Sequence, residues 1–227
     1  MEIEKIVVLS LLTLLVFLTG KDALPILAFV LKPDAMRYSF DDSFAGQELI
    51  SKSGELQDWV RRLQELGFFL LGVKAEKLPL WGPAYREAAL ASRESETYAS
   101  IVLHRNGKPA SLYFYTPFRD GGMVFTRNHA FAPEAEGERV SVQNVPVQDF
   151  KEILDNHEQR LRIFKESGLA PMPGYNQQAR IEATRAFYES DYSRRHGRYL
   201  MSPNVLGFGV SLLLLLYAAY RIAFASL

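Results

Sequence analysis

The sequence predicts an α+β protein, in which an antiparallel β-sheet with flanking helices forms one soluble domain between an N-terminal and a C-terminal transmembrane helix. Three observations predict this class. Both ends of the chain carry apolar runs, the middle holds short segments of alternating polar and apolar residues, and segments of helical periodicity lie on either side of them. Because the expected strands are joined by short turns, we expect neighbouring strands to run antiparallel.

The N-terminal apolar run predicts a transmembrane helix over residues 3–20, which acts as an uncleaved signal anchor. A helix of this length spans about 27 Å, adequate for a slightly thinned bilayer. A cleaved signal peptide is the alternative, but the leader MEIEK is not basic and Leu18-Thr19-Gly20 is a poor cleavage site. Residues 21–53 are expected to be an interfacial segment and linker, irregular from residue 33, unless the first helix continues past a kink at Pro25.

The soluble α+β domain is expected over residues 54–175. Residues 54–66 carry an apolar stripe at helical spacing, and Gly67 is suited to end that helix. The strongest hairpin signal is Asn106-Gly107, which lies between two alternating segments. Strands are expected in six segments of the chain, at 68–73, 85–93, 97–105, 110–116, 123–128 and 139–144, with a turn at 117–122.

Two more helices are expected after the strands. Pro146 suits the first position of a helix that runs to about Ser167. Residues 176–202 form a charged juxtamembrane helix, with Ile181, Thr184 and Tyr188 on one side.

The C-terminal run predicts a transmembrane helix over residues 203–225, with Ser202-Pro203 at its start. Such a helix spans roughly 34 Å against a hydrocarbon core of about 30 Å, and Arg221 is its only charge. Gly207 and Ser211 put small residues on one face, where another helix can pack closely. That helix would belong to another membrane protein or to a second copy of this chain.

The distribution of basic residues predicts which side of the membrane the domain faces. Lysines and arginines gather on the domain side of both spans, at Lys21, Lys32, Arg37, Arg185, Arg194, Arg195 and Arg198. By the positive-inside rule the protein is an integral protein of a plasma or inner membrane with a cytoplasmic central domain. An extracytoplasmic domain is the alternative, because the rule weakens when the connecting domain is long.

Composition excludes several classes of function. The chain has 26 basic and 26 acidic residues, a balance that argues against a nucleic-acid partner. It has no cysteine, so disulfides, cysteine nucleophiles and thiolate metal sites are excluded. The sequence carries no phosphate-binding loop, nucleophile elbow or HExxH motif, and no cofactor or metal site is predicted.

His157 is one candidate catalytic residue, because it lies on the apolar stripe of its helix and could act as a base. A neutral core histidine is the more common outcome at such a position. Asp120 and His129 are the other catalytic candidates, at the two ends of the most polar stretch of the chain. In the same stretch, a polar or anionic ligand could bind to Arg119, Arg127 and Asn128, although Asp120 followed by two glycines is also ordinary turn chemistry.

Two functional hypotheses follow. The favoured one is a non-enzymatic binding or assembly module at the membrane surface, such as an accessory subunit of a membrane complex. Exposed Tyr113 and Tyr115, with Phe114 facing inward, would favour it. The alternative is a membrane-tethered hydrolase or transferase, which requires His157, Asp120 or His129 to meet in one pocket. A transporter or channel subunit ranks last, because two spans offer no polar pathway.

Overall fold

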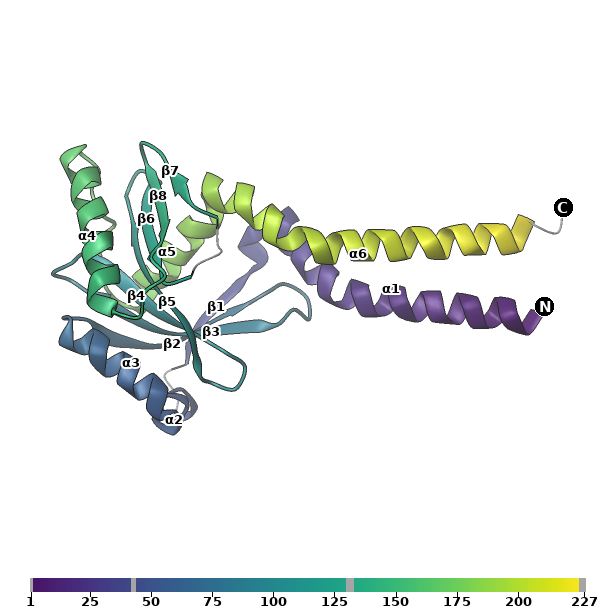
Figure 1. The fold of residues 1–227 in the computed structure, drawn as a ribbon, viewed down its shortest axis with the longest axis horizontal. Helices are drawn as coiled ribbons and strands as arrows, with labels where there is room; N and C mark the ends of the chain where they lie inside the picture. Colours follow the sequence, from purple (N-terminus) through teal and green to yellow (C-terminus); the bar gives the residue numbers. More distant parts are fainter. Residues whose placement is uncertain (1, 42–43, 130–132, 225–227) are drawn as a thin grey trace. The chain divides into compact units, whose positions relative to one another are not determined.

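The computed structural model describes residues 2–41, 44–129 and 133–224, and the chain forms two compact units. We call the first the helical unit: it contains the chain up to residue 36, residues 78–83 and the chain from residue 195. The second, the α+β unit, contains residues 37–77 and 84–194. Figure 1 draws both units with the elements labelled.

The α+β unit is built on one eight-stranded sheet in the order β1-β2-β3-β4-β5-β6-β8-β7. The class expected from sequence is confirmed, with one difference in strand direction: β6 and β8 pair in parallel, while all other neighbours are antiparallel. The strands are β1 (Arg37–Asp41), β2 (Phe69–Lys77), β3 (Ala84–Ser92), β4 (Thr97–Leu103), β5 (Pro109–Pro117), β6 (Met123–Arg127), β7 (Ala135–Glu136) and β8 (Val140–Asn144).

The hairpin expected at Asn106-Gly107 is present between β4 and β5. The His104 N–H donates to the Lys108 carbonyl at 2.9 Å, and Gly107 adopts a positive φ of 81°. A side chain in place of Gly107 would also meet Leu49 at 2.9 Å, so glycine serves both the turn and the packing.

Helices cover both faces of the sheet, and β5 divides its side chains between the two layers. Leu112 and Phe114 point into a core with α3 (Gly54–Glu65) and α4 (Phe150–Glu166). The alternate residues Tyr113 and Tyr115 point to the opposite face, against α5 (Gln177–Glu189). The exposed interface that the binding-module hypothesis expects at Tyr113 and Tyr115 is therefore absent from the described structure, because both tyrosines lie under a helix.

Several segment boundaries differ from the sequence-based expectation. Residues 33–53 are not an irregular linker, since they hold a 3₁₀ turn (Pro33–Ala35), β1 and α2 (Phe44–Lys52). The α4 helix begins after Pro146, because Asp149 caps it by accepting from the Lys151 N–H at 2.9 Å. The helical pattern expected from residue 176 breaks at Ser190, and Ser202-Pro203 lies within α6 (Asp191–Phe224).

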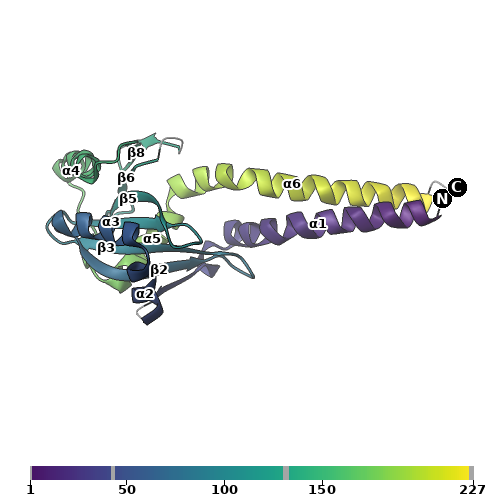
Figure 2. The same ribbon diagram turned by 60° about the horizontal axis from the view of Figure 1, so that its bottom comes forward.

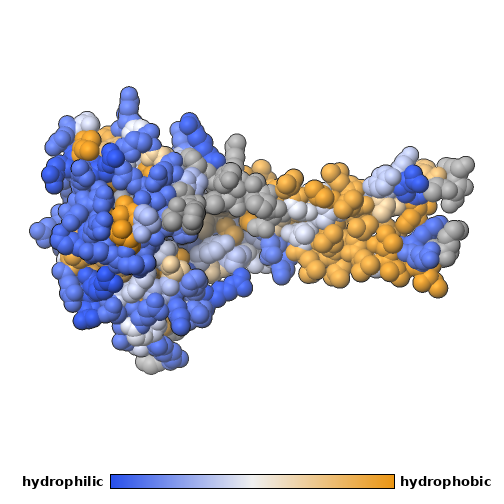
Figure 3. All heavy atoms as spheres, in the orientation of Figure 1, coloured by the Kyte–Doolittle hydropathy of each residue, from blue (hydrophilic) through white to orange (hydrophobic). Residues whose placement is uncertain are grey.

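The helical unit contains α1 (Glu2–Leu31) and the part of α6 from residue 195. Two segments, Ile3–Leu31 and Val205–Ile222, are long and apolar enough to cross a membrane by length and composition, and little of either is buried. Hydrophobic side chains gather over these helices in Figure 3, whereas hydrophilic ones dominate the visible surface of the α+β unit. α1 continues through Pro25 as one helix.

The two long helices touch where small side chains allow it, and both views show them side by side (Figures 1 and 2). The Thr19 and Ser211 hydroxyls hydrogen-bond at 2.8 Å, and the Phe208 ring lies 2.8 Å from where a side chain on Gly20 would begin. Ser211 is therefore a packing residue within this chain. Gly207 faces open space, because a side chain added there would meet nothing within 4 Å.

Cysteines at positions 19 and 211 should test the helix pair, because the native chain has none. The double variant Thr19→Cys/Ser211→Cys should form an intramolecular disulfide in detergent or vesicles, detected as a mobility shift that reductant reverses. Adding Gly20→Val should slow that reaction, since its side chain would collide with Phe208. Adding Gly207→Val is the matched control and should leave the rate unchanged. Equal rates in both backgrounds would contradict the pairing.

Candidate functional site: a buried charge cluster beside an aromatic cavity

The face of the sheet under α5 carries charged side chains at positions that a strand directs into the protein. Lys74 and Glu76 lie two residues apart on β2 and therefore point to the same face. Glu87 lies on β3 directly opposite Lys74 in the strand register. All three are buried, although charged residues are rarely buried without partners.

The α5 helix supplies the other half of the cluster. Its N-cap, Asn176, accepts from the Ala179 N–H, and this helps to set where the helix begins. Arg180 and Thr184 are one turn apart, so both project from the face of α5 that packs on the sheet. The Arg180 guanidinium donates to Glu87 at 2.9 Å, Thr184 at 2.8 Å, Ser100 at 3.0 Å and the Tyr113 hydroxyl at 2.7 Å.

The charges within this cluster balance and are extensively hydrogen-bonded. The Lys74 ammonium uses all three donors, on Glu76 at 2.6 Å, Glu87 at 2.7 Å and Thr184 at 2.8 Å. The positive charges of Lys74 and Arg180 thus balance the negative charges of Glu76 and Glu87, so the cluster has no net charge.

Glu87 sits at the centre of the cluster. Burial alone would raise the pKa of its carboxyl, but Lys74 and Arg180 outweigh that effect and hold the pKa at about 2. Its two oxygens accept from Lys74, Arg180, Ser100 and Tyr113, which fills the acceptor capacity of a carboxylate. Glu87 is therefore ionised at neutral pH and joins β2, β3, β4, β5 and α5.

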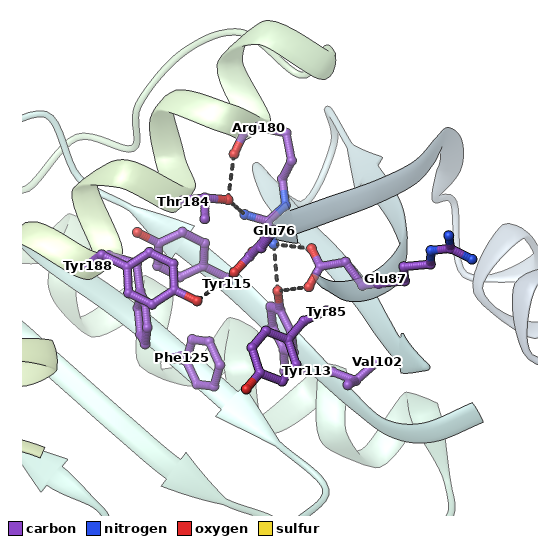
Figure 4. A pocket seen from close by; sticks show the side chains of 12 residues that line it. Glu76, Tyr85, Glu87, Val102, Tyr113, Tyr115, Phe125, Arg180, Thr184 and Tyr188 are labelled. Atoms are coloured by element: carbon purple, nitrogen blue, oxygen red, sulfur yellow. Dashed lines mark hydrogen bonds and ion pairs between the residues drawn. The ribbon is translucent and has the colours of Figure 1, made fainter. Parts of the chain in front are cut away.

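A cavity of about 230 Å³ opens beside the cluster, and Figure 4 shows the residues around it. Arg180 and Thr184 approach from α5, near the carboxylates of Glu76 and Glu87 (Figure 4). Two ring stacks form part of the wall, with centroids 4.8 Å apart for Tyr113 and Phe125 and 5.4 Å for Phe125 and Phe187. The aromatic residues that line the cavity are Tyr85, Tyr113, Tyr115, Phe125, Phe187 and Tyr188.

Two arginines that line the cavity have hydrogen-bond donors without a partner among the described residues. The Nε of Arg180 is buried and has no hydrogen-bond partner among the residues that the structure describes. Arg86 also lines the cavity, is exposed, and takes part in no ion pair within the described part of the chain. A buried donor without an acceptor is unfavourable, and the exposed guanidinium of Arg86 offers further donors to an acceptor in the cavity.

The structure places His157 in the opposite face of the sheet, away from this cavity. The imidazole is completely buried and bonds the hydroxyls of Thr116 through Nε2 and Thr126 through Nδ1, both at 3.0 Å. Thr116 is in turn bonded to Thr97 at 2.9 Å. Burial lowers the pKa of His157 to about 3, so the ring is neutral and its nitrogens are occupied within the core.

The other candidates from the sequence do not gather around His157. Asp120 lies in the turn before β6 and is exposed, with Arg139 at 3.8 Å. His129 is exposed beyond the opposite end of β6, so these two flank a whole strand. Within the described residues, no group of histidine and acidic side chains is placed to hold a metal ion.

The three candidate ligand-binding residues are also spread along β6. Arg119 is exposed beside Asp120, whereas Arg127 and Asn128 lie at the far end of the strand. Arg127 donates to Asn144 at 2.7 Å and to the Pro133 carbonyl at 2.8 Å. Asn128 exchanges two hydrogen bonds with the Leu112 backbone, so both residues serve the sheet edge.

Sequence reasoning missed Lys74, Glu76, Glu87 and Arg180. Charged residues are normally exposed, so alternation such as Lys74-Ala75-Glu76 suggests a solvated strand face. The available signal was the spacing of two between Lys74 and Glu76 in an otherwise apolar strand, together with Arg180 four residues before Thr184. Neither signal tells which strands are neighbours.

Glu87→Gln should strongly destabilise the α+β unit, because it leaves two buried cations, Lys74 and Arg180, with Glu76 as the one carboxylate of the cluster. The expected loss is on the order of 3 kcal/mol, or about 6–12 °C in the midpoint of thermal unfolding. Near-ultraviolet circular dichroism of the full chain in mild detergent measures it. Asp155→Asn is the control, since its pair with Lys151 is exposed to solvent and should leave the midpoint almost unchanged. Equal shifts would contradict a structural role for the cluster.

His157 should make stability depend on pH between about 6.5 and 3. The unfolded chain protonates this ring below about 6.5, but the folded protein does so only near 3. The unfolded state binds more protons in between, so stability should fall as pH is lowered, by up to about 1.4 kcal/mol per unit. His157→Gln, measured by thermal unfolding at each pH, should flatten this slope. An unchanged slope would show that His157 is not held neutral.

No known protein family, curated protein or solved structure matches this chain in the comparisons made. We therefore infer the function from the residues that line the cavity.

Proposed function

We propose that the protein is a membrane-anchored binding module, and that its α+β unit takes up a small organic molecule with a flat apolar body and an acidic end. The observation that carries this proposal is the cavity of about 230 Å³ between the aromatic wall and the buried charge cluster. Its size is below the roughly 300–1,000 Å³ of pockets for drug-sized ligands, which favours a small molecule or a single chemical group.

The aromatic wall favours a flat apolar ligand body. Tyr113, Phe125 and Phe187 form a continuous stack whose geometry a further ring can extend. Burial of such a ring is favourable because it removes apolar surface from water.

The polar part of the lining favours an acceptor, and a carboxylate above all. The Nε of Arg180 and the guanidinium of Arg86 are donors without partners among the described residues, whereas Glu87 already accepts from four groups. An ammonium group would have to compete with Lys74 for the carboxylates. A carboxylate would instead meet unused donors.

The state of the charged groups supports binding over catalysis. A general base works best with a pKa near the operating pH, and Glu87 has a pKa of about 2. Lys74 spends its donors on ion pairs and a hydroxyl, so its amine is not a ready nucleophile. The membrane-tethered hydrolase or transferase therefore has less support than the binding module.

In this proposal the two apolar helices hold the domain at a plasma or inner membrane. Their exposed apolar side chains support that role, since a contiguous apolar surface of this kind is unfavourable in water. The basic residues between the spans favour a cytoplasmic domain, as the positive-inside rule requires.

Three probes of similar shape test the ligand class: phenylacetate, 2-phenylethanol and phenethylammonium. Titration calorimetry on the full chain in mild detergent should rank phenylacetate first, because only its carboxylate can accept from both arginines. Arg86→Gln should weaken phenylacetate binding about tenfold, the effect of losing one charged hydrogen bond. Arg105→Gln, at an exposed arginine in the β4–β5 turn, is the matched control and should bind normally.

Two outcomes would contradict this proposal. If phenethylammonium binds best, the carboxylates and not the arginines dominate the cavity. If none of the probes binds the folded protein at millimolar concentration, the cavity is not a site for this class of molecule.

A further inference from the structure

The β2–β3 loop presents two large apolar side chains on the surface of the helical unit. This loop, Leu78–Pro83, makes its contacts with that unit, although the strands on either side belong to the α+β unit. Leu80 is 59% exposed and Trp81 is 60% exposed. Burial of an exposed leucine and tryptophan against an apolar surface is favourable, because it removes their side chains from water.

The backbone holds these side chains in a defined place. A tight turn forms from Pro79 to Gly82, with the Gly82 N–H donating to the Pro79 carbonyl at 3.1 Å. Leu80 occupies it with a positive φ of 59°, a conformation that leucine rarely adopts. Strain of this kind at an exposed apolar residue is typical of functional positions.

Trp81 is tied to α1 at a carbonyl that the helix itself cannot satisfy. In a regular helix the Lys21 carbonyl accepts from the N–H of residue 25, but that residue is Pro25, which has none. The indole Nε1–H of Trp81 donates to this carbonyl at 3.0 Å. Gly82 packs against the same turn, because a side chain there would begin 2.9 Å from Pro25.

This attachment point is the position of the first charged residues after the long apolar run of α1. Residues from Ile3 to Gly20 form about 27 Å of apolar helix, interrupted only by Glu4 and Lys5 near its start. Lys21 and Asp22 follow and are exposed. Beyond them Ala23 and Phe29 are buried, whereas Leu24 and Leu31 are exposed, so an apolar surface resumes after the charge pair. Exposed charges are unfavourable among lipid tails, so Lys21 and Asp22 favour a headgroup level at this position of the helix.

We propose that Leu80 and Trp81 form a third membrane contact, inserted at the boundary between the lipid headgroups and the acyl chains. Tryptophan is enriched at this boundary, because its ring is apolar and its N–H is polar. The occupant is lipid, since the loop continues the apolar surface of α1 at the level where Lys21 and Asp22 interrupt that surface. This inference rests on the membrane anchoring in the proposed function and is independent of the cavity ligand.

The depth of Trp81 in a bilayer tests the inference directly. The chain has two tryptophans, so Trp59→Phe leaves Trp81 as the only indole. The full-length variant in phosphatidylcholine vesicles is titrated with lipids that carry nitroxides near the headgroup or deep in the acyl chain. Shallow nitroxides should quench Trp81 at least about twofold more than deep ones, and aqueous iodide should quench it weakly. Trp81→Phe, which leaves Trp59 packed on Phe150, gives the reference level for an indole inside the α+β unit.

Leu80→Asn provides a second readout, because it removes the apolar side chain next to the indole. In the Trp59→Phe background it should reduce quenching by the shallow nitroxides and increase quenching by iodide. The substitution should leave the fold intact, because asparagine tolerates a positive φ better than leucine does.

The results distinguish the lipid contact of Leu80 and Trp81 from the anchoring of the protein by its two apolar helices. If carbonate extraction leaves the protein in the membrane but iodide quenches Trp81 as fully as a free indole, the loop contact is wrong and the helices still anchor the chain. If neither iodide nor nitroxide lipids quench Trp81, protein covers the loop, and the lipid assignment is overturned. If carbonate releases the protein, both the anchoring and the loop contact fail.

Discussion

The interaction on which the α+β unit depends most is the carboxylate of Glu87 held between Lys74 and Arg180. Isolated charges cannot be buried in a protein interior, so each of these three groups requires the other two. The ion pairs join two strands to α5, and the tyrosine and serine bonds to Glu87 add two more strands. The position of α5 over the sheet, and hence the cavity beside it, follows from this electrostatic constraint.

The buried polar groups on the two faces of the sheet are satisfied in different ways. Under α4, His157 stays neutral and is satisfied by two threonine hydroxyls, which makes that face a closed core. Under α5, ionised groups pair with one another and one guanidinium nitrogen remains without an acceptor. An incompletely satisfied network next to open space suits ligand binding, whereas a fully satisfied one suits stability.

In the helical unit, a polar group of the backbone is also satisfied by a side chain. Pro25 removes one helical donor, and the indole of Trp81 replaces it on the Lys21 carbonyl. One polar contact thus fixes the loop against the helix, while its apolar neighbours stay exposed. Where Thr19 and Ser211 meet, hydroxyls and glycine let two apolar helices approach closely without a buried charge.

Sequence alone determined the features that depend on local spacing. It identified the two apolar helices, the α3 stripe ending at Gly67 and the Asn106-Gly107 hairpin, because periodicity, composition and turn chemistry act over a few residues. The start of α4 was less accurate because both Pro146 and Asp149 suit a helix start, and the strand and helix in residues 33–53 were missed because edge pairing depends on distant contacts. The site itself was decided by the tertiary structure. Lys74, Glu87 and Arg180 are far apart along the chain, and each alone indicates a solvated surface; only strand register and the placement of α5 bring their charges together, where burial makes them partners.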